Sequence, residues 1–168
     1  LRSTDEYSYD HAVDVSVHIM VLARFLGMPA KTVEMLGKVG LMQDIGKINL
    51  SDTVLNKQED LSDEELALVQ SHVASSLEIL AGQHGFSFEA LAIVGSHHER
   101  FDGSGYPRRI QGERISLHAE LAGLRRPGLR RHRRDGELVG DAHQEVRHRM
   151  AVEILHHPVV VHDAHLVV

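Results

Sequence analysis

The chain of 168 residues contains no cysteine and no tryptophan, and only 4% of its residues are aromatic. Without cysteine, disulfide bonds, thiolate metal sites and cysteine nucleophiles are excluded. The scarcity of aromatic side chains and the net charge of −6 argue against nucleic-acid binding. No apolar run approaches the roughly 20 residues that span a bilayer, and no signal peptide begins the chain. We therefore expect a cytoplasmic protein that neither binds nucleic acid nor enters a membrane.

Histidine, by contrast, is abundant. The chain has 14 histidines, several times the usual frequency, and seven of them precede residue 125. Histidine is the commonest metal ligand in proteins and titrates near neutral pH. The length suits one compact domain with a hydrophobic core. The composition thus indicates a metal site, provided that the histidines converge.

The composition changes abruptly near Leu124. Residues 1–124 carry ten Lys and Arg against eighteen Asp and Glu, whereas residues 125–168 carry eight Arg and six acidic residues. The second segment is rich in Arg and His and lacks Lys, Ser, Thr, Asn, Phe, Tyr and Trp. Three interpretations remain open: a basic nucleic-acid-binding arm, a natural tail, or a segment translated in a shifted reading frame. We therefore treat residues 1–124 as the domain and residues 125–168 as an atypical tail.

The spacing of apolar residues predicts helices throughout residues 1–124, with no strand pair and no internal repeat. The predicted helices cover about residues 9–26, 30–43, 62–82 and 88–99, and Ser116 caps one more. Ser62 and Glu65 form a capping-box pattern. Gly37 and Gly40 would weaken an isolated helix, so we expect them to pack closely against a neighbour. The predicted fold class is all-α.

Five candidate ligands lie on or at the ends of four predicted helices: His11, Asp44, His72, His97 and His98. Neutral imidazole together with carboxylate suits iron, manganese, zinc or nickel, and favours a catalytic over a purely structural site. Each position alone has an ordinary explanation, such as a hydrogen-bonded core histidine or a helix end, but five together are hard to explain separately. The other histidines of this region are interpreted as surface or packing residues: His18, His84 and His118.

The segment Asp44–Lys47, His72 and the segment His97–Pro107 resemble the motifs of the HD-GYP domain, a subgroup of the HD metal-dependent phosphohydrolases. The resemblance covers about residues 7–124. It implies an HD-domain bundle of about five to seven helices that holds iron or manganese. It also implies hydrolysis of the bacterial messenger cyclic di-GMP to pGpG or GMP, and an N-terminal sensor or receiver domain or a GGDEF-type protein as partner.

The resemblance also assigns roles by position. The metal ligands are then His11, Asp44, His72, His97 and His98. Asp44 resembles the aspartate that bridges metals, and Lys47 resembles the lysine that contacts a phosphate oxygen. Two cations can activate water for attack on a phosphodiester and neutralise the charge that develops.

Gly103, Gly105, Tyr106 and Pro107 resemble the Gly-Tyr-Pro loop of the HD-GYP family. The resemblance implies that this loop shapes the substrate side of the cavity. Arg108, next to it, is assigned either to phosphate or partner binding or to a solvated rim.

The sequence departs from the family pattern at three places. Gln43 stands where the HD signature has a histidine, and an amide oxygen is a poorer metal ligand than imidazole. Arg125 and Arg126 occupy the place of the last aspartate ligand, and arginine cannot coordinate a metal. Tyr7 stands where the three-metal subgroup has a glutamate, so we expect one or two ions and no third.

These departures leave two principal functions open. The first is a cyclic di-GMP phosphodiesterase slowed by Gln43, and in either case we expect the chain to bind at most one metal tightly. The second is a catalytically silent signalling module, an altered member that binds cyclic di-GMP or partner proteins through the Gly103–Pro107 loop. An HD phosphohydrolase of other nucleotides is disfavoured, because it leaves the Gly-Tyr-Pro string unexplained.

Overall fold

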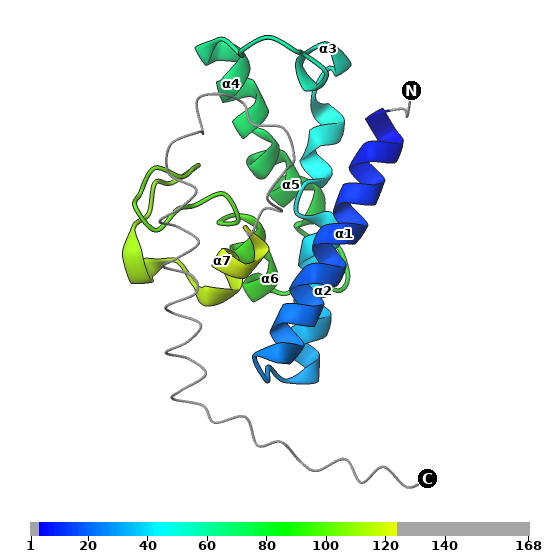
Figure 1. Cartoon of the computed structure of the whole chain (residues 1–168), viewed down its shortest axis with the longest axis vertical. Helices are drawn as coiled ribbons and strands as arrows, with labels where there is room; N and C mark the ends of the chain where they lie inside the picture. Colours follow the sequence, from blue (N-terminus) through cyan, green and yellow to red (C-terminus); the bar gives the residue numbers. More distant parts are fainter. Residues whose placement is uncertain (1–3, 124–168) are drawn as a thin grey trace, which may run out of the picture.

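The computed structural model describes residues 4–123, and its description of side chains begins at Tyr9 (Figure 1). This part of the chain is all-α and contains no strand. Its helices are α1 (Thr4–Phe25), α2 (Ala30–Met42), η1 (Ile45–Asn49), α3 (Asp52–Leu55), α4 (Asp63–Gln70), α5 (His72–Leu80), α6 (Phe88–Val94), η2 (Gly112–Arg114) and α7 (Leu117–Ala122). The predictions about Arg125, Arg126, the tail and the Tyr7 side chain lie outside the described residues. No helix within residues 4–123 is long and apolar enough to cross a membrane.

The longest helix, α1, packs along α2 at one edge of the molecule (Figure 1). The contact is close because α2 presents glycines to α1. A Cβ at Gly40 would lie 2.9 Å from Ser16 Cα, and one at Gly37 would lie 2.9 Å from Met20 Cγ. The Ser16 hydroxyl donates to the Gly37 carbonyl at 2.8 Å, which ties the two helices together. The predicted packing role of both glycines is confirmed.

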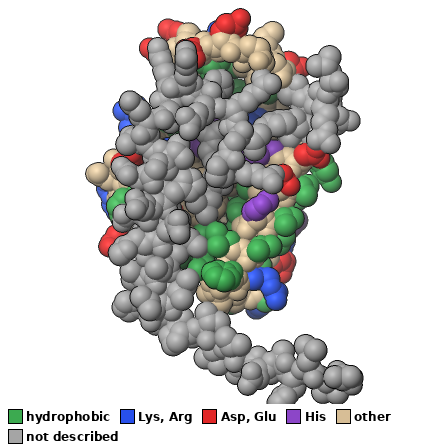
Figure 2. All heavy atoms as spheres, viewed as in Figure 1, with side chains coloured by type: hydrophobic (Ala, Val, Ile, Leu, Met, Phe, Trp, Pro, Cys, Tyr) green, Lys and Arg blue, Asp and Glu red, His purple; other side chains and the backbone are tan. Residues whose placement is uncertain are grey.

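The buried core lies between α1, α2, α6 and α7. Its fully enclosed side chains include Leu36, Val39, Val94 and Leu121. Of the other helices, α5 contributes Leu80 to the core and packs against η1, and α4 contacts α5 (Figure 1). The outer face of α1 lies away from the core, and Figure 2 shows hydrophobic side chains along this edge of the molecule.

Two predicted helix starts are confirmed by their caps. Ser62 accepts from the Glu65 N–H at 3.2 Å, and Glu65 accepts from the Ser62 N–H at 2.7 Å, which completes the capping box. Ser116 caps α7 by accepting from the Ala119 N–H at 3.2 Å. Each cap pairs backbone groups that the first helical turn leaves without a partner.

Two predicted helices are wrong in extent. The helix predicted over residues 62–82 is divided at Ser71, whose N–H is shared between the Ala67 and Leu68 carbonyls and whose hydroxyl donates to Leu68 O at 2.7 Å. The helix predicted over residues 88–99 ends at Val94, so His97 and His98 lie in the turn that follows α6. The short helices η1 and α3 follow α2, where no helix was predicted.

We expect Gly40→Val to lower the free energy of unfolding by about 1–3 kcal/mol, because the new side chain overlaps the backbone of α1 at Ser16. The matched control is Lys38→Val, which places the same side chain on the exposed face of the same helix. Urea unfolding monitored by circular dichroism measures both. Equal stability of the two variants would contradict the close α1–α2 packing.

Candidate metal centre

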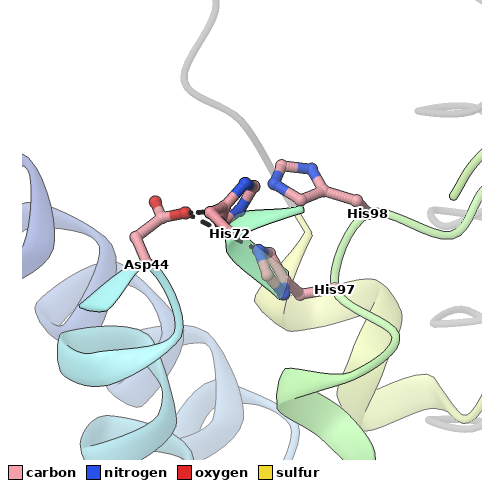
Figure 3. A group of neighbouring side chains, drawn as sticks. All are labelled: Asp44, His72, His97 and His98. Carbon is pink, nitrogen blue, oxygen red and sulfur yellow. Dashed lines mark ion pairs between the residues drawn. The ribbon is translucent and has the colours of Figure 1, made fainter. Parts of the chain in front are cut away.

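Four side chains converge where η1, α5 and the turn after α6 meet (Figure 3). Asp44 lies between α2 and η1, His72 is the first residue of α5, and His97 and His98 follow α6. Each residue offers one ligand atom, and these atoms all lie within 4.8 Å of one another. Four of the five predicted ligands are therefore brought to one place.

The converging atoms fit a metal ion. Asp44 Oδ1 and the Nε2 atoms of His72, His97 and His98 are buried, and none forms a hydrogen bond of acceptable geometry with any described residue. Buried polar atoms without partners are costly, so a group of four pointing together calls for a shared ligand. Two of the imidazole nitrogens lie close to the carboxylate oxygen: His72 Nε2 is 3.1 Å and His97 Nε2 is 3.7 Å from Asp44 Oδ1.

Backbone carbonyls orient two of the imidazole rings. Nδ1 of His72 lies 2.6 Å from Val69 O, and Nδ1 of His97 lies 2.6 Å from Val94 O. A carbonyl can only accept, so each Nδ1 donates its proton to the carbonyl and each Nε2 points at the cluster. This is the ring orientation that a metal-binding histidine requires.

The charges of the cluster also suit a cation. Burial raises the pKa of the Asp44 carboxyl, but His72, His97 and the Lys47 ammonium lower it more, so its pKa lies well below the ordinary value. Burial, followed by the neighbouring His97, lowers the pKa of His98 well below its ordinary value. At neutral pH the site therefore offers an ionised carboxylate and a neutral His98 imidazole, the forms that bind metals.

A close backbone approach at Gly46 holds Asp44 beside His72. A Cβ at Gly46 would overlap the His72 carbonyl oxygen and lie 2.5 Å from Ser76 N. The Gly46 N–H donates to the Ser76 hydroxyl at 2.8 Å, and Ser76 is fully buried. Sequence reasoning did not single out Ser76, because a serine inside a helix carries no signal of a partner 30 residues away.

The second carboxylate oxygen of Asp44 faces the other two predicted residues. Lys47 Nζ lies 3.0 Å from Asp44 Oδ2, and His11 Nε2 lies 3.9 Å from the same atom. His11 comes from α1 and stands apart from the group of four, although it borders the same carboxylate. Asp44 thus has histidines on both sides, an arrangement in which one carboxylate can contact two ions.

The predicted substrate loop, Gly103–Pro107, lies beside His98. Gly105 lies so close to the preceding chain that a Cβ there would overlap Arg100 N and lie 2.5 Å from Glu99 Cα. The Tyr106 N–H donates to His98 O at 3.1 Å, and the two rings stack with centroids 4.5 Å apart. Gly103 adopts a φ of +80°, which favours glycine at this turn.

Glu99 fixes the end of the same loop. Its buried carboxylate accepts from the N–H groups of Arg108 at 2.7 Å and Ile110 at 3.1 Å. Arg108 is an exposed residue whose guanidinium donates to the buried Ser96 hydroxyl, while Pro107 is exposed at the loop surface. Sequence reasoning missed the role of Glu99, although its place beside the His97-His98 pair could have drawn attention to it.

Gln43 and Gly123 complete the surroundings of the cluster. The Gln43 side chain is buried, and its Nε2 donates to the Ala122 carbonyl at 3.2 Å. Its Oε1 is buried and has no hydrogen-bond partner among residues 4–123. A Cβ at Gly123 would overlap the His97 carbonyl oxygen, so the end of α7 packs directly against the backbone of His97.

Known proteins are similar to this chain in sequence. Residues 1–124 match the sequence model of the family described as HD domain. "Cyclic di-GMP phosphodiesterase PA4108" of Pseudomonas aeruginosa is 38% identical over 124 residues, which cover 74% of this chain and 30% of that protein. "3'3'-cGAMP-specific phosphodiesterase 3" of Vibrio cholerae is 36% identical over 111 residues, which cover 66% of this chain and 24% of that protein.

A solved structure shows the same fold. It is described as "Bd1817, a HDG"Y"P protein from Bdellovibrio bacteriovorus" and is similar with a TM-score of 0.61 and 25% sequence identity, over 73% of this chain and 40% of that chain. The chain spans less than a third of the length of the two curated relatives.

We expect Asp44→Asn to lower metal affinity at least about tenfold, because an amide carries no charge to offset the cation. The matched control is Asp52→Asn, which makes the same change on the exposed surface of α3. Metal content after purification and titration with Mn²⁺ measure the effect. Equal affinity in the two variants would show that the cluster is not the binding site.

Proposed function

The chain belongs to the HD domain family, and we propose that it is a metal-dependent phosphodiesterase that hydrolyses cyclic di-GMP to pGpG or GMP. The observation that carries the proposal is the convergence of one carboxylate oxygen and three imidazole nitrogens, all buried and without hydrogen-bond partners among the described residues. The relatives are named as phosphodiesterases of cyclic dinucleotides, which supports the same class of substrate.

The residues that would hold the metal are those of the cluster, with His11 on the far side of Asp44: Asp44, His72, His97, His98 and His11. One or two divalent ions bound there, iron or manganese by the family resemblance, would lower the pKa of water and offset the charge that develops on the phosphate. No third ion is proposed.

The chain's own residues would position the substrate. The Lys47 ammonium lies at the partly exposed side of the cluster, 3.0 Å from Asp44 Oδ2, where it can attract a phosphate oxygen. Gly103, Gly105, Tyr106 and Pro107 form the loop that would border the substrate, and the Tyr106 ring lies against His98. Arg108 is exposed at the edge of this loop and would contact substrate or a partner through its charge.

A catalytically silent module that binds cyclic di-GMP or a partner protein is the second candidate. The observation that favours it is Gln43, which directs its amide nitrogen to the Ala122 carbonyl and offers no imidazole beside Asp44. In either role, a sensor or receiver domain or a GGDEF-type protein would supply the signal, in the cytoplasm.

We expect Lys47→Ala to lower kcat/KM for cyclic di-GMP by about ten- to a hundredfold, because it removes a positive charge at the phosphate. Metal content should stay unchanged, since lysine is not a ligand. Lys31→Ala, on the exposed start of α2, is the matched control. Loss of metal from the Lys47 variant would contradict a role confined to the substrate.

Comparing the unaltered chain with Gln43→His separates the two candidates. We expect the unaltered chain to retain at most one ion tightly, and Gln43→His to raise metal content and turnover of cyclic di-GMP, because imidazole replaces an amide. Turnover by the unmodified chain supports the enzyme. Binding of cyclic di-GMP without turnover, relieved by the substitution, supports the silent module.

A further inference from the structure

The outer face of α1 carries an exposed apolar ridge. Val17, Val21 and Phe25 are 46%, 63% and 72% exposed and follow one another at intervals of four residues. Residues at this spacing form a continuous row on a helix surface. Figure 2 shows hydrophobic side chains gathered along this edge. The opposite face of α1 is occupied by the core, through Ile19 and Ala23.

We propose that this ridge binds the same ridge of a second copy of the chain, with the two α1 helices antiparallel around a two-fold axis at the level of residue 19. In this register, Val17 of one copy lies opposite Val21 of the other. The half-buried Val13 lies opposite Phe25. A two-fold interface requires a surface that is complementary to itself, and this row of residues meets that requirement.

The charges that flank the ridge select the antiparallel direction. Asp14 lies on the N-terminal side of the exposed valines and Arg24 lies on the C-terminal side, and both are exposed. The same axis that pairs Val17 with Val21 places Asp14 opposite Arg24 of the partner, twice in each dimer. A parallel pair would instead set aspartate against aspartate and arginine against arginine, which is unfavourable.

The packing rules and the position of α1 allow this contact. Rows of residues at intervals of four pack against each other at a crossing angle of about −50°. His11 faces Asp44 and is not part of the ridge. A crossing of single helices is smaller than the roughly 1,200–2,000 Å² of a stable interface, so we expect a dimer that dissociates in the micromolar range.

Sedimentation of the whole chain from about 1 to 200 μM tests the proposal. We expect the parent to pass from monomer to dimer, and Val21→Asp to raise the dissociation constant at least about tenfold, because it places two carboxylates in the apolar contact. Phe88→Asp is the matched control, since Phe88 is 89% exposed on α6 and outside the ridge. A parent that stays monomeric, or a dimer that persists in Val21→Asp, would overturn the proposal.

A charge exchange tests the direction and register. Asp14→Arg alone and Arg24→Glu alone should each weaken the dimer, because each sets like charges opposite one another. The double variant should restore it, since each pair is then reversed rather than broken. Circular dichroism of the monomers checks that all variants fold. Failure of the double variant to recover dimerisation would exclude the antiparallel register.

Discussion

The close approach of two backbones at Gly46 determines the geometry of the candidate site. No side chain fits between η1 and the start of α5, so Asp44 is held against His72. The Gly46–Ser76 hydrogen bond fixes this contact from the helix side. A close backbone approach also occurs at Gly105, which lies against the chain at His98 and Glu99, and at Gly123, which lies against the His97 carbonyl. Glycine at these positions lets three separate segments bring four side chains to one point.

The sequence predicts the fold class and family well because both depend on local patterns. The apolar spacing predicts helices, and the cap residues Ser62 and Ser116 mark two of their starts. The packing of Gly37 and Gly40 also follows from sequence, since glycine inside a helix needs a compensating contact. The family resemblance is confirmed by the match of residues 1–124. The roles assigned to the site residues remain predictions, although four of the five ligands converge.

The features that sequence reasoning missed depend on individual hydrogen bonds, which apolar spacing does not register. Apolar spacing continues across Ser71, but the Ser71 hydroxyl and the His72 ring both bond to carbonyls of the preceding turn and divide the helix. The Glu99 carboxylate acts on backbone N–H groups about ten residues away, a contact that no local pattern specifies. Periodicity describes one helix at a time and therefore gives no account of such pairings.

Because Tyr106 stacks on His98, tyrosine fluorescence can report whether the candidate metal centre is occupied. The chain has three tyrosines and no tryptophan, so its ultraviolet fluorescence comes mainly from tyrosine. One of the three emitting rings lies 4.5 Å from an imidazole of the cluster. A paramagnetic ion held by that imidazole would quench the emission of Tyr106 at short range. Occupancy of the centre can therefore be followed by fluorescence of the unlabelled protein.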